Sequence, residues 1–156
     1  TVIGSDNFLM EGVHISHDTK VGNHCIFSYG AKIVGDCEIA DHAIFSSSVI
    51  QKANTRVGTA AYITAGTTFA RDIPPYIVAG GNPIAYDSVN TSICRELGIS
   101  EKVIKHIANA YRLVFHGQTS VFYACIQVND QVPDSPEIRN IVEFIQKTEQ
   151  GIICKL

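Results

Sequence analysis

Hydrophobic side chains recur at every sixth residue through the first half of the chain, and only Gln51 breaks this series of large apolar residues. Four residues after most of them stands a smaller side chain, as at Val13 and Ala31. A period of six fits neither a helix nor a simple strand, but it is typical of a triangular coil whose three flat sides each take one hexad. The large series is Ile3, Leu9, Ile15, Val21, Phe27, Ile33, Ile39, Phe45, Gln51, Val57, Ile63 and Phe69.

Three hexads make an 18-residue coil, and this longer period is visible as well. One corner of each coil carries a small residue that eases the bend, in Ile3-Gly4, Val21-Gly22, Ile39-Ala40 and Val57-Gly58. Residues 1 to about 74 therefore predict four coils, stacked like parallel strands about 4.8 Å apart. An alternating β-sandwich competes with this interpretation, but hairpin pairs such as Asn-Gly are absent. The sequence predicts a mainly β fold, a left-handed parallel β-helix of hexapeptide repeats.

The hexad pattern ends at Pro74-Pro75, because two prolines cannot donate to a sheet ladder. Helical spacing and capping residues then predict amphipathic helices that pack on the solenoid as a cap. We expect a β-helix over residues 1–82 and an α-helical C-terminal domain over 83–156. The predicted helices run from Ser100 to Gly117, from 120 to 130 and from Asp134 to near Gly151.

Composition narrows the class of protein. A net charge of -3 and a pI near 6.0 argue against a nucleic-acid-binding protein. The longest apolar stretches are shorter than the roughly 20 residues of a membrane helix, and no leader opens the chain, so we expect a cytoplasmic protein without an integral membrane segment.

The repeat is already in phase at Thr1, so we expect a truncated chain or a partner that covers the first coil. Five cysteines without a CxxC favour reduced, mostly buried thiols.

The densest polar cluster is His14-Ile15-Ser16-His17-Asp18. His17 and Asp18 fall at a corner and point outward, and a histidine beside an aspartate suits a general base that takes a proton from a hydroxyl. Gly35 lies one coil above His17, where a glycine lets a substrate approach backbone N–H groups, as an oxyanion site requires. A plain solvent-exposed corner is the alternative interpretation.

Two other chemistries are compatible with parts of this pattern. His14 and His17 with His24 or His42 of a neighbouring chain could bind a metal, as in β-helical carbonic anhydrases, but the spacing differs from their histidine pattern, so we expect neither metal nor cofactor. Lys52, Arg56 and Arg71 fall at outward positions and could attract an acidic partner.

Several short motifs carry a family resemblance. They are Gly4-Ser5-Asp6-Asn7, His14-x-x-His17-Asp18, Asp72-Ile73-Pro74-Pro75-Tyr76, Gly81-Asn82, Val89-Asn90 and Asn109-Ala110-Tyr111. With them the chain resembles the latter part of the UDP-N-acetylglucosamine O-acyltransferases, and residues 106–113 look like the Bacteroidetes branch. The family transfers a 3-hydroxyacyl group from acyl carrier protein to the glucosamine 3-hydroxyl of UDP-N-acetylglucosamine, starting lipid A synthesis, and works as a homotrimer with sites between subunits.

The resemblance also implies roles for single residues. His17 would be the general base, Asp18 its orienting partner and the Gly35 amide the oxyanion donor. His14 and Asn90 would contact substrate. Lys52 falls where the family lines its cleft, and Ala65 falls where it measures its acyl chain. The chain departs from the family at Asp36, where many members carry histidine, at Lys52-Ala53, which replaces a His-Gln pair, and at Glu96-Leu97, which replaces two arginines.

The sequence leaves three functions open. The first is acyl transfer with His17 as base. The second is a truncated or non-catalytic trimeric β-helix that serves as a binding or assembly module. The third is a related sugar-nucleotide N-acyltransferase, which product analysis would separate from the first.

Overall fold

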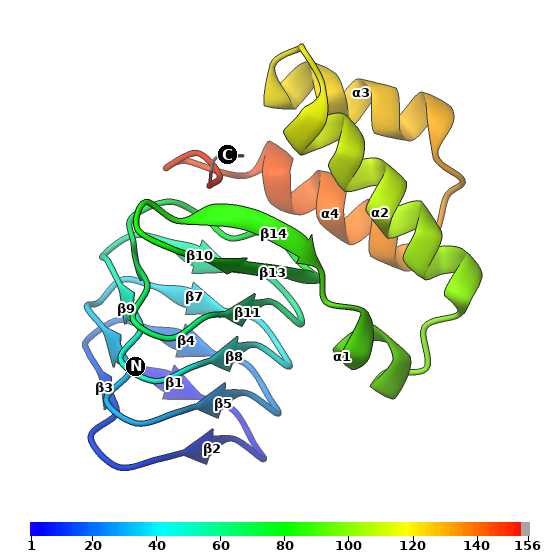
Figure 1. Ribbon diagram of the computed structural model, residues 1–156. Coiled ribbons are helices and arrows are strands. Elements are labelled where there is room, and N and C mark those ends of the chain that lie inside the picture. The colour runs from blue at the N-terminus through cyan, green and yellow to red at the C-terminus, as the bar shows by residue number, and fades with distance from the viewer. Residues whose placement is uncertain (154–156) are drawn as a thin grey trace.

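The computed structural model describes residues 1–153 of the 156-residue chain as a parallel β-helix with helices over one end (Figure 1). Twelve two-residue strands form its sides. They are β1 (Val2–Ile3), β2 (Phe8–Leu9), β3 (His14–Ile15), β4 (Lys20–Val21), β5 (Ile26–Phe27), β6 (Lys32–Ile33), β7 (Glu38–Ile39), β8 (Ile44–Phe45), β9 (Ile50–Gln51), β10 (Arg56–Val57), β11 (Tyr62–Ile63) and β12 (Thr68–Phe69).

The strands pair in parallel at an 18-residue offset, as Val2 does with Lys20. Sheet A has the order β1-β4-β7-β10, sheet B contains β2-β5-β8-β11, and sheet C has the order β3-β6-β9-β12. The prediction of a parallel β-helix of about four coils is confirmed.

The predicted inward series forms the core. Phe27 and Phe45 stack in successive coils with ring centroids 4.9 Å apart, and both are fully buried. Ile3 and Leu9 point inward but stay 46% and 45% exposed, because only one face of the first coil is covered by another coil of this chain. The buried Gln51 donates from Nε2 to the Thr55 carbonyl oxygen at 3.1 Å, so the one polar exception is partly satisfied.

The corners depend on left-handed backbone. Asp18, Asp36 and Asn54 occupy equivalent corners of successive coils with φ between 50° and 64°, a region that Asp and Asn tolerate better than most residues. At the other recurring position the structure shows a steric reason for Gly4 in addition to the expected bend. A Cβ on Gly4 would lie 2.5 Å from the Gly22 carbonyl oxygen, so close stacking of coils selects glycine there.

A hairpin that was not predicted ends the β-helix. Its first strand, β13 (Ile77–Gly80), pairs in parallel with β11, and its second, β14 (Ala85–Val89), pairs antiparallel with β13. Sheet residues therefore follow position 82, where the helical domain was expected to begin. The division of the chain into two domains stays a prediction.

Four helices follow, α1 (Thr91–Glu96), α2 (Glu101–His116), α3 (Val121–Gln131) and α4 (Pro136–Gln146). Serine caps three of them. The side chains of Ser100, Ser120 and Ser135 each accept a hydrogen bond from the backbone amide three residues later. The three predicted helices are confirmed, although α4 ends before Gly151, and α1 was not predicted. No described helix is long and apolar enough to cross a membrane.

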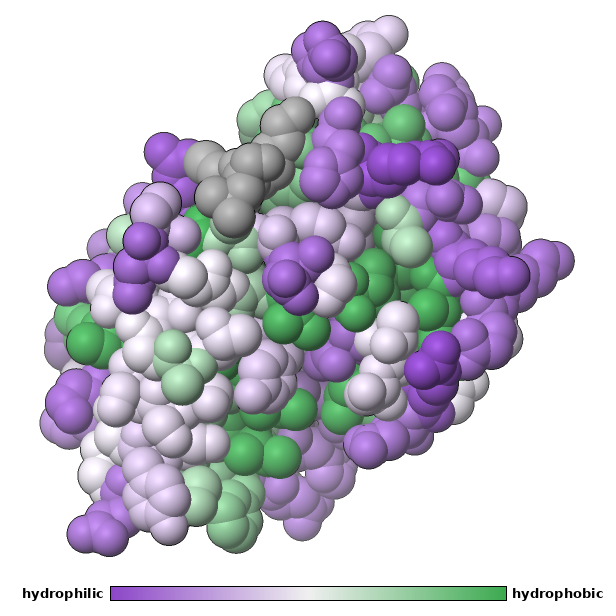
Figure 2. Space-filling model, viewed as in Figure 1, coloured by the Kyte–Doolittle hydropathy of each residue, from purple (hydrophilic) through white to green (hydrophobic). Residues whose placement is uncertain are grey.

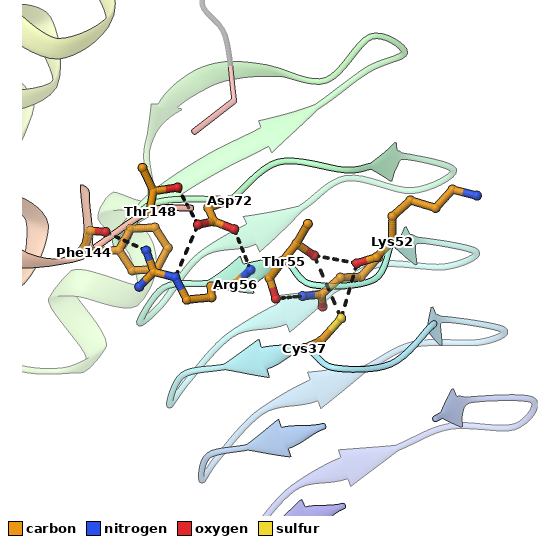
Figure 3. A network of polar contacts seen from close by, with 8 residues as sticks. Cys37, Lys52, Thr55, Arg56, Asp72, Phe144 and Thr148 are labelled. Atoms are coloured by element: carbon orange, nitrogen blue, oxygen red, sulfur yellow. Dashed lines mark hydrogen bonds and ion pairs between the residues drawn. The ribbon is translucent and has the colours of Figure 1, made fainter. Parts of the chain in front are cut away.

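An ionic cluster attaches the C-terminal segment to the β-helix (Figure 3). The buried Asp72 carboxylate accepts from the Arg56 amide at 2.8 Å, from Arg56 Nε at 3.3 Å and from Thr148 Oγ1 at 2.6 Å. The Arg56 guanidinium also donates to the Phe144 carbonyl oxygen and lies 4.1 Å from the centre of the Phe144 ring. From the sequence Arg56 could attract an acidic partner, but in the structure it is committed to this internal contact.

The described cysteines are free thiols. Cys25, Cys37, Cys94 and Cys125 are all buried, as predicted, and Cys154 lies outside the described residues. Burial raises the pKa of Cys25 and of Cys94 to about 11, so both stay protonated near neutral pH.

Tyr111 provides the first testable contact of the helical cap. Its side chain is fully buried, its hydroxyl donates to the Pro75 carbonyl oxygen, and burial raises its pKa well above 10. Tyr111→Phe removes this donor from a buried carbonyl, so we expect a loss of about 1–3 kcal/mol in urea unfolding. Tyr123→Phe, at a 52% exposed position, should change the unfolding free energy little. Equal effects of both changes would contradict the assigned hydrogen bond.

Candidate active site

The polar cluster of the sequence folds into one corner of the β-helix, between sheets C and A. We call residues 16–18, 34–36 and 52–54, which stack in three successive coils, the site corner. Backbone hydrogen bonds join its layers, because the Asp36 amide donates to the His17 carbonyl oxygen at 3.0 Å and the Asn54 amide to the Gly35 carbonyl oxygen at 3.3 Å. The side chains on this corner are thus carried by a rigid ladder.

His17 lies between two carboxylates. Its Nδ1 is 3.1 Å from Asp18 Oδ2 and 4.0 Å from Asp36 Oδ2. The His17 and Asp18 side chains are 70% and 75% exposed, so the imidazole is open to a ligand. Asp18 occupies Nδ1, so Nε2 is the ring nitrogen that remains available to a substrate. No described residue forms a hydrogen bond with Nε2.

Gly35 packs directly against the His17 ring. A Cβ at this position would lie 2.9 Å from His17 Nε2 and 3.0 Å from Cε1, and the φ of +138° is one that other residues rarely adopt. Both the contact and the backbone require glycine. The structure therefore brings His17, Asp18 and Gly35 together, as the 18-residue stacking suggested.

His14 and Lys52 lie beside this group. His14 opens β3, is exposed and pairs in register with Lys32 of the next coil. Lys52 follows β9 at the top of the site corner and is also exposed.

Ala65 and Asn90 lie elsewhere in the chain. Ala65 is exposed beside Gly66, at the corner that also carries Gly12 and Gly30. Asn90 begins α1 at the third corner, where its Nδ2 donates to the Ala60 carbonyl oxygen at 3.0 Å and its amide donates to Tyr76. The candidate residues are thus spread over all three corners, so one chain does not gather them into one site.

The metal-ligand set considered from the sequence is not assembled within the chain. His24 and His42 stack with ring centroids 5.0 Å apart, at the corner of Asn90 rather than at His17. His17, Asp18 and Asp36 do have ligand atoms within 4.8 Å of one another, but all three side chains are exposed. Exposed groups of this kind are common without an ion, so they alone do not define a metal site.

A groove beside the site corner was missed from the sequence. It has a volume of about 310 Å³ and runs from Asp36 and Asn54 toward the segment after α4. Lys147 and Glu149 form its far wall, and no local pattern links them to residues so distant in the sequence. The remaining lining residues are Glu38, Arg56 and Asp72.

Comparison with known proteins identifies the family. A model of UDP-N-acetylglucosamine O-acyltransferase, domain 2, matches residues 72–153, which is more than half of the chain, and a bacterial transferase hexapeptide model matches residues 1–34. The chain belongs to the UDP-N-acetylglucosamine O-acyltransferase family. The site corner and the helical cap are parts of that family's fold.

Several relatives in this family match nearly the whole chain. The acyl-carrier-protein–UDP-N-acetylglucosamine O-acyltransferase of Burkholderia lata is 33% identical over 157 residues, covering 98% of this chain and 60% of the relative. The UDP-N-acetylglucosamine acyltransferase structure from Bacteroides fragilis 9343 superposes with a TM-score of 0.92 at 44% identity, over 94% of this chain and 58% of that one. LpxA from Acinetobacter baumannii gives a TM-score of 0.94 at 30% identity, over 98% and 60%. The chain therefore spans about 60% of the length of these relatives.

Proposed function

We propose that this chain carries the acyl-transfer centre of a UDP-N-acetylglucosamine O-acyltransferase in lipid A biosynthesis. The observation that carries the proposal is the contact of His17 with Gly35 on one side and with Asp18 on the other, in a chain of this family. The donor would be a 3-hydroxyacyl thioester of acyl carrier protein, the acceptor the 3-hydroxyl of UDP-N-acetylglucosamine, and the compartment the cytoplasm.

The proposed reaction uses the His17 imidazole as base and the Gly35 N–H as oxyanion donor. His17 Nε2 takes the proton of the acceptor hydroxyl while the hydroxyl oxygen attacks the thioester carbonyl carbon. The carbonyl oxygen becomes an oxyanion, which the Gly35 N–H stabilises. The C–S bond then breaks, and the carrier thiolate leaves and recovers the proton from the His17 imidazolium. Asp18 at Nδ1 keeps the proton of the neutral ring on that nitrogen, so that Nε2 is free to act as the base.

The separation of the candidates over three corners supports an assembly of copies. In a homotrimer, the site corner of one copy faces residues from another corner of its neighbour. The outward positions of sheet B form a column of apolar and aromatic side chains that suits such an interface, and green residues lie over these strands in Figure 2. This column consists of Phe8, Ile26, Ile44, Tyr62 and Val78. The outward positions of sheet A instead carry Lys20, Glu38 and Arg56.

Substrate contacts follow from the same arrangement. His14 and Lys52 flank the base and would contact the acceptor, while Ala65 would limit the length of the acyl chain. Asn90 Nδ2 already donates to the Ala60 carbonyl oxygen, so Oδ1 would be the side-chain atom that contacts substrate.

The second candidate is a non-catalytic trimeric module. It is favoured by Asp36, which puts a second carboxylate 4.0 Å from His17. It is also favoured by Lys52, which stands where the family resemblance implies a histidine of the cleft. In this case the β-helix would bind a partner without turnover.

An acyl-transfer assay separates the two. The purified chain would be incubated with 3-hydroxyacyl carrier protein and UDP-N-acetylglucosamine, with product mass analysis and light scattering on the same sample. A trimer that forms 3-O-acylated product is expected. A folded trimer that forms none favours the binding module, and a monomer would contradict the proposed shared site.

Gly35→Ala tests the contact between Gly35 and the His17 ring. The new methyl group would meet the His17 ring, so we expect the ring to move and turnover to fall about 100-fold, the order of loss from a misplacement of about 1 Å. Gly66→Ala is the matched control, because Gly66 also has a positive φ, of 74°, but no atom within 4 Å of its Cβ position. Both variants place alanine at a positive φ, but only Gly35→Ala places a methyl group against the His17 ring. Equal turnover in the two variants would contradict the role of Gly35.

A further inference from the structure

The three corners of the β-helix differ on the inside. Thr19, Cys37 and Thr55 lie behind the site corner, one in each coil, and none has exposed surface. The inward positions behind the other corners are mostly apolar, with Val13, Ala31, Val49 and Thr67 behind the corner of Ala65, and Asn7, Cys25, Ala43 and Ala61 behind the corner of Asn90. Only the site corner is backed by hydroxyl or thiol groups through three successive coils.

Each of these groups contacts a carbonyl oxygen of the site corner. Thr19 Oγ1 donates to His17 at 3.3 Å, and Thr55 Oγ1 donates to Lys52 at 2.7 Å. Cys37 Sγ lies 3.2 Å from the Gly35 carbonyl oxygen, so its single S–H can donate within its own coil. It also lies 3.3 Å from the Lys52 carbonyl oxygen of the next coil (Figure 3). The Gln51 side chain in turn donates to the Thr55 carbonyl oxygen.

We propose that Thr19, Cys37 and Thr55 are positioning residues, which hold the site-corner backbone so that Gly35 stays against the His17 ring. The effect of this ladder on turnover rests on the proposed function, but its effect on the backbone does not. The corner is exposed on its outer side, so buried donors restrain its carbonyl groups from within. Orientation of the Gly35 peptide groups matters, because displacement of a reacting geometry by about 1 Å costs on the order of 100-fold in rate.

Cys37→Ala tests this inference, with Cys25→Ala as the matched control. Both cysteines are buried and both lie within 3.2 Å of a carbonyl oxygen, but Cys25 contacts Ala40 at another corner. Both variants lose the same atoms, so their thermal stabilities should fall alike. We expect kcat to fall about tenfold for Cys37→Ala with KM within about twofold of wild type, and Cys37→Ser to restore kcat. Cys25→Ala should keep the wild-type kcat.

Amide resonances of labelled protein provide a readout without turnover. The Gly35 and Asp36 signals should move in Cys37→Ala and in Thr55→Val, and stay in place in Cys25→Ala. Unmoved Gly35 signals, or equal movement in the cysteine control, would overturn the inference. If wild type has no turnover, the proposed function fails, whereas these signals still decide the positioning role. If Cys37→Ala does not fold, the Gly35 and Asp36 signals of Thr55→Val and the kcat of Cys37→Ser decide the positioning role.

Discussion

Replacement of His17 by alanine is expected to reduce acyl transfer by about 10²–10⁴-fold, the usual contribution of a general base. The loss should appear mainly in kcat, since the imidazole takes its proton only as the hydroxyl attacks. The side chain is 70% exposed, so the unfolding transition should stay at its wild-type position. The measurement is steady-state transfer at saturating donor, beside thermal unfolding of the same sample.

His24→Ala is the matched control for this change. His24 is another exposed corner histidine, in the coil next to that of His17, and its ring stacks on His42. It lies at the corner of Asn90 but is assigned no proton transfer, so its kcat should stay far above that of His17→Ala. A His17→Ala protein that turns over as fast as His24→Ala would exclude the general-base mechanism.

The second large effect is on stability, at Asp72. Asp72→Ala removes the acceptor that satisfies the Arg56 amide, the Arg56 guanidinium and the Thr148 hydroxyl at once. Asp72 is 1% exposed and the Arg56 side chain 21%, so the arginine would be left partly buried without its counter-charge. Loss of one partner of a buried pair costs about 3–5 kcal/mol, and urea unfolding at fixed chain concentration would measure it.

Asp134→Ala provides the comparison for Asp72. Asp134 pairs with Arg139 at 2.6 Å, but the two side chains are 69% and 61% exposed, so water replaces the lost contact. Its unfolding midpoint should stay near that of wild type. If Asp72→Ala unfolds at the same urea concentration as Asp134→Ala, the ionic cluster does not hold the C-terminal segment to the β-helix.

The fold could be predicted where the same six-residue spacing repeats along the chain. A six-residue period defines both the inward face and the coil length, so the core at Phe27 and Phe45 follows from spacing alone. The hairpin β13–β14 was not found this way, because β14 carries no hexad and is held by pairing with β13, and Gly80-Gly81 alone fits a loop as well as a turn. The short helix α1 has six residues and no side-chain cap, so it left no local signal.

The candidate site was predictable within one stack of coils. An offset of 18 residues places Gly35 over His17, and the sequence shows this directly. Contacts across the fold were not predictable, because Arg56 looks like a surface charge until α4 packs against it. The Nδ2 group of Asn90 likewise proves to be engaged by Ala60, 30 residues earlier in the chain.

The most direct test of the proposed site is a titration of the isotope-labelled chain with UDP-N-acetylglucosamine, followed by amide resonances. We predict saturable shifts at Gly35, Asp36 and residues near His14, with weaker binding in the Lys52→Ala variant. Shifts confined to other surfaces, or none at millimolar acceptor, would contradict an acceptor site at the His17 corner.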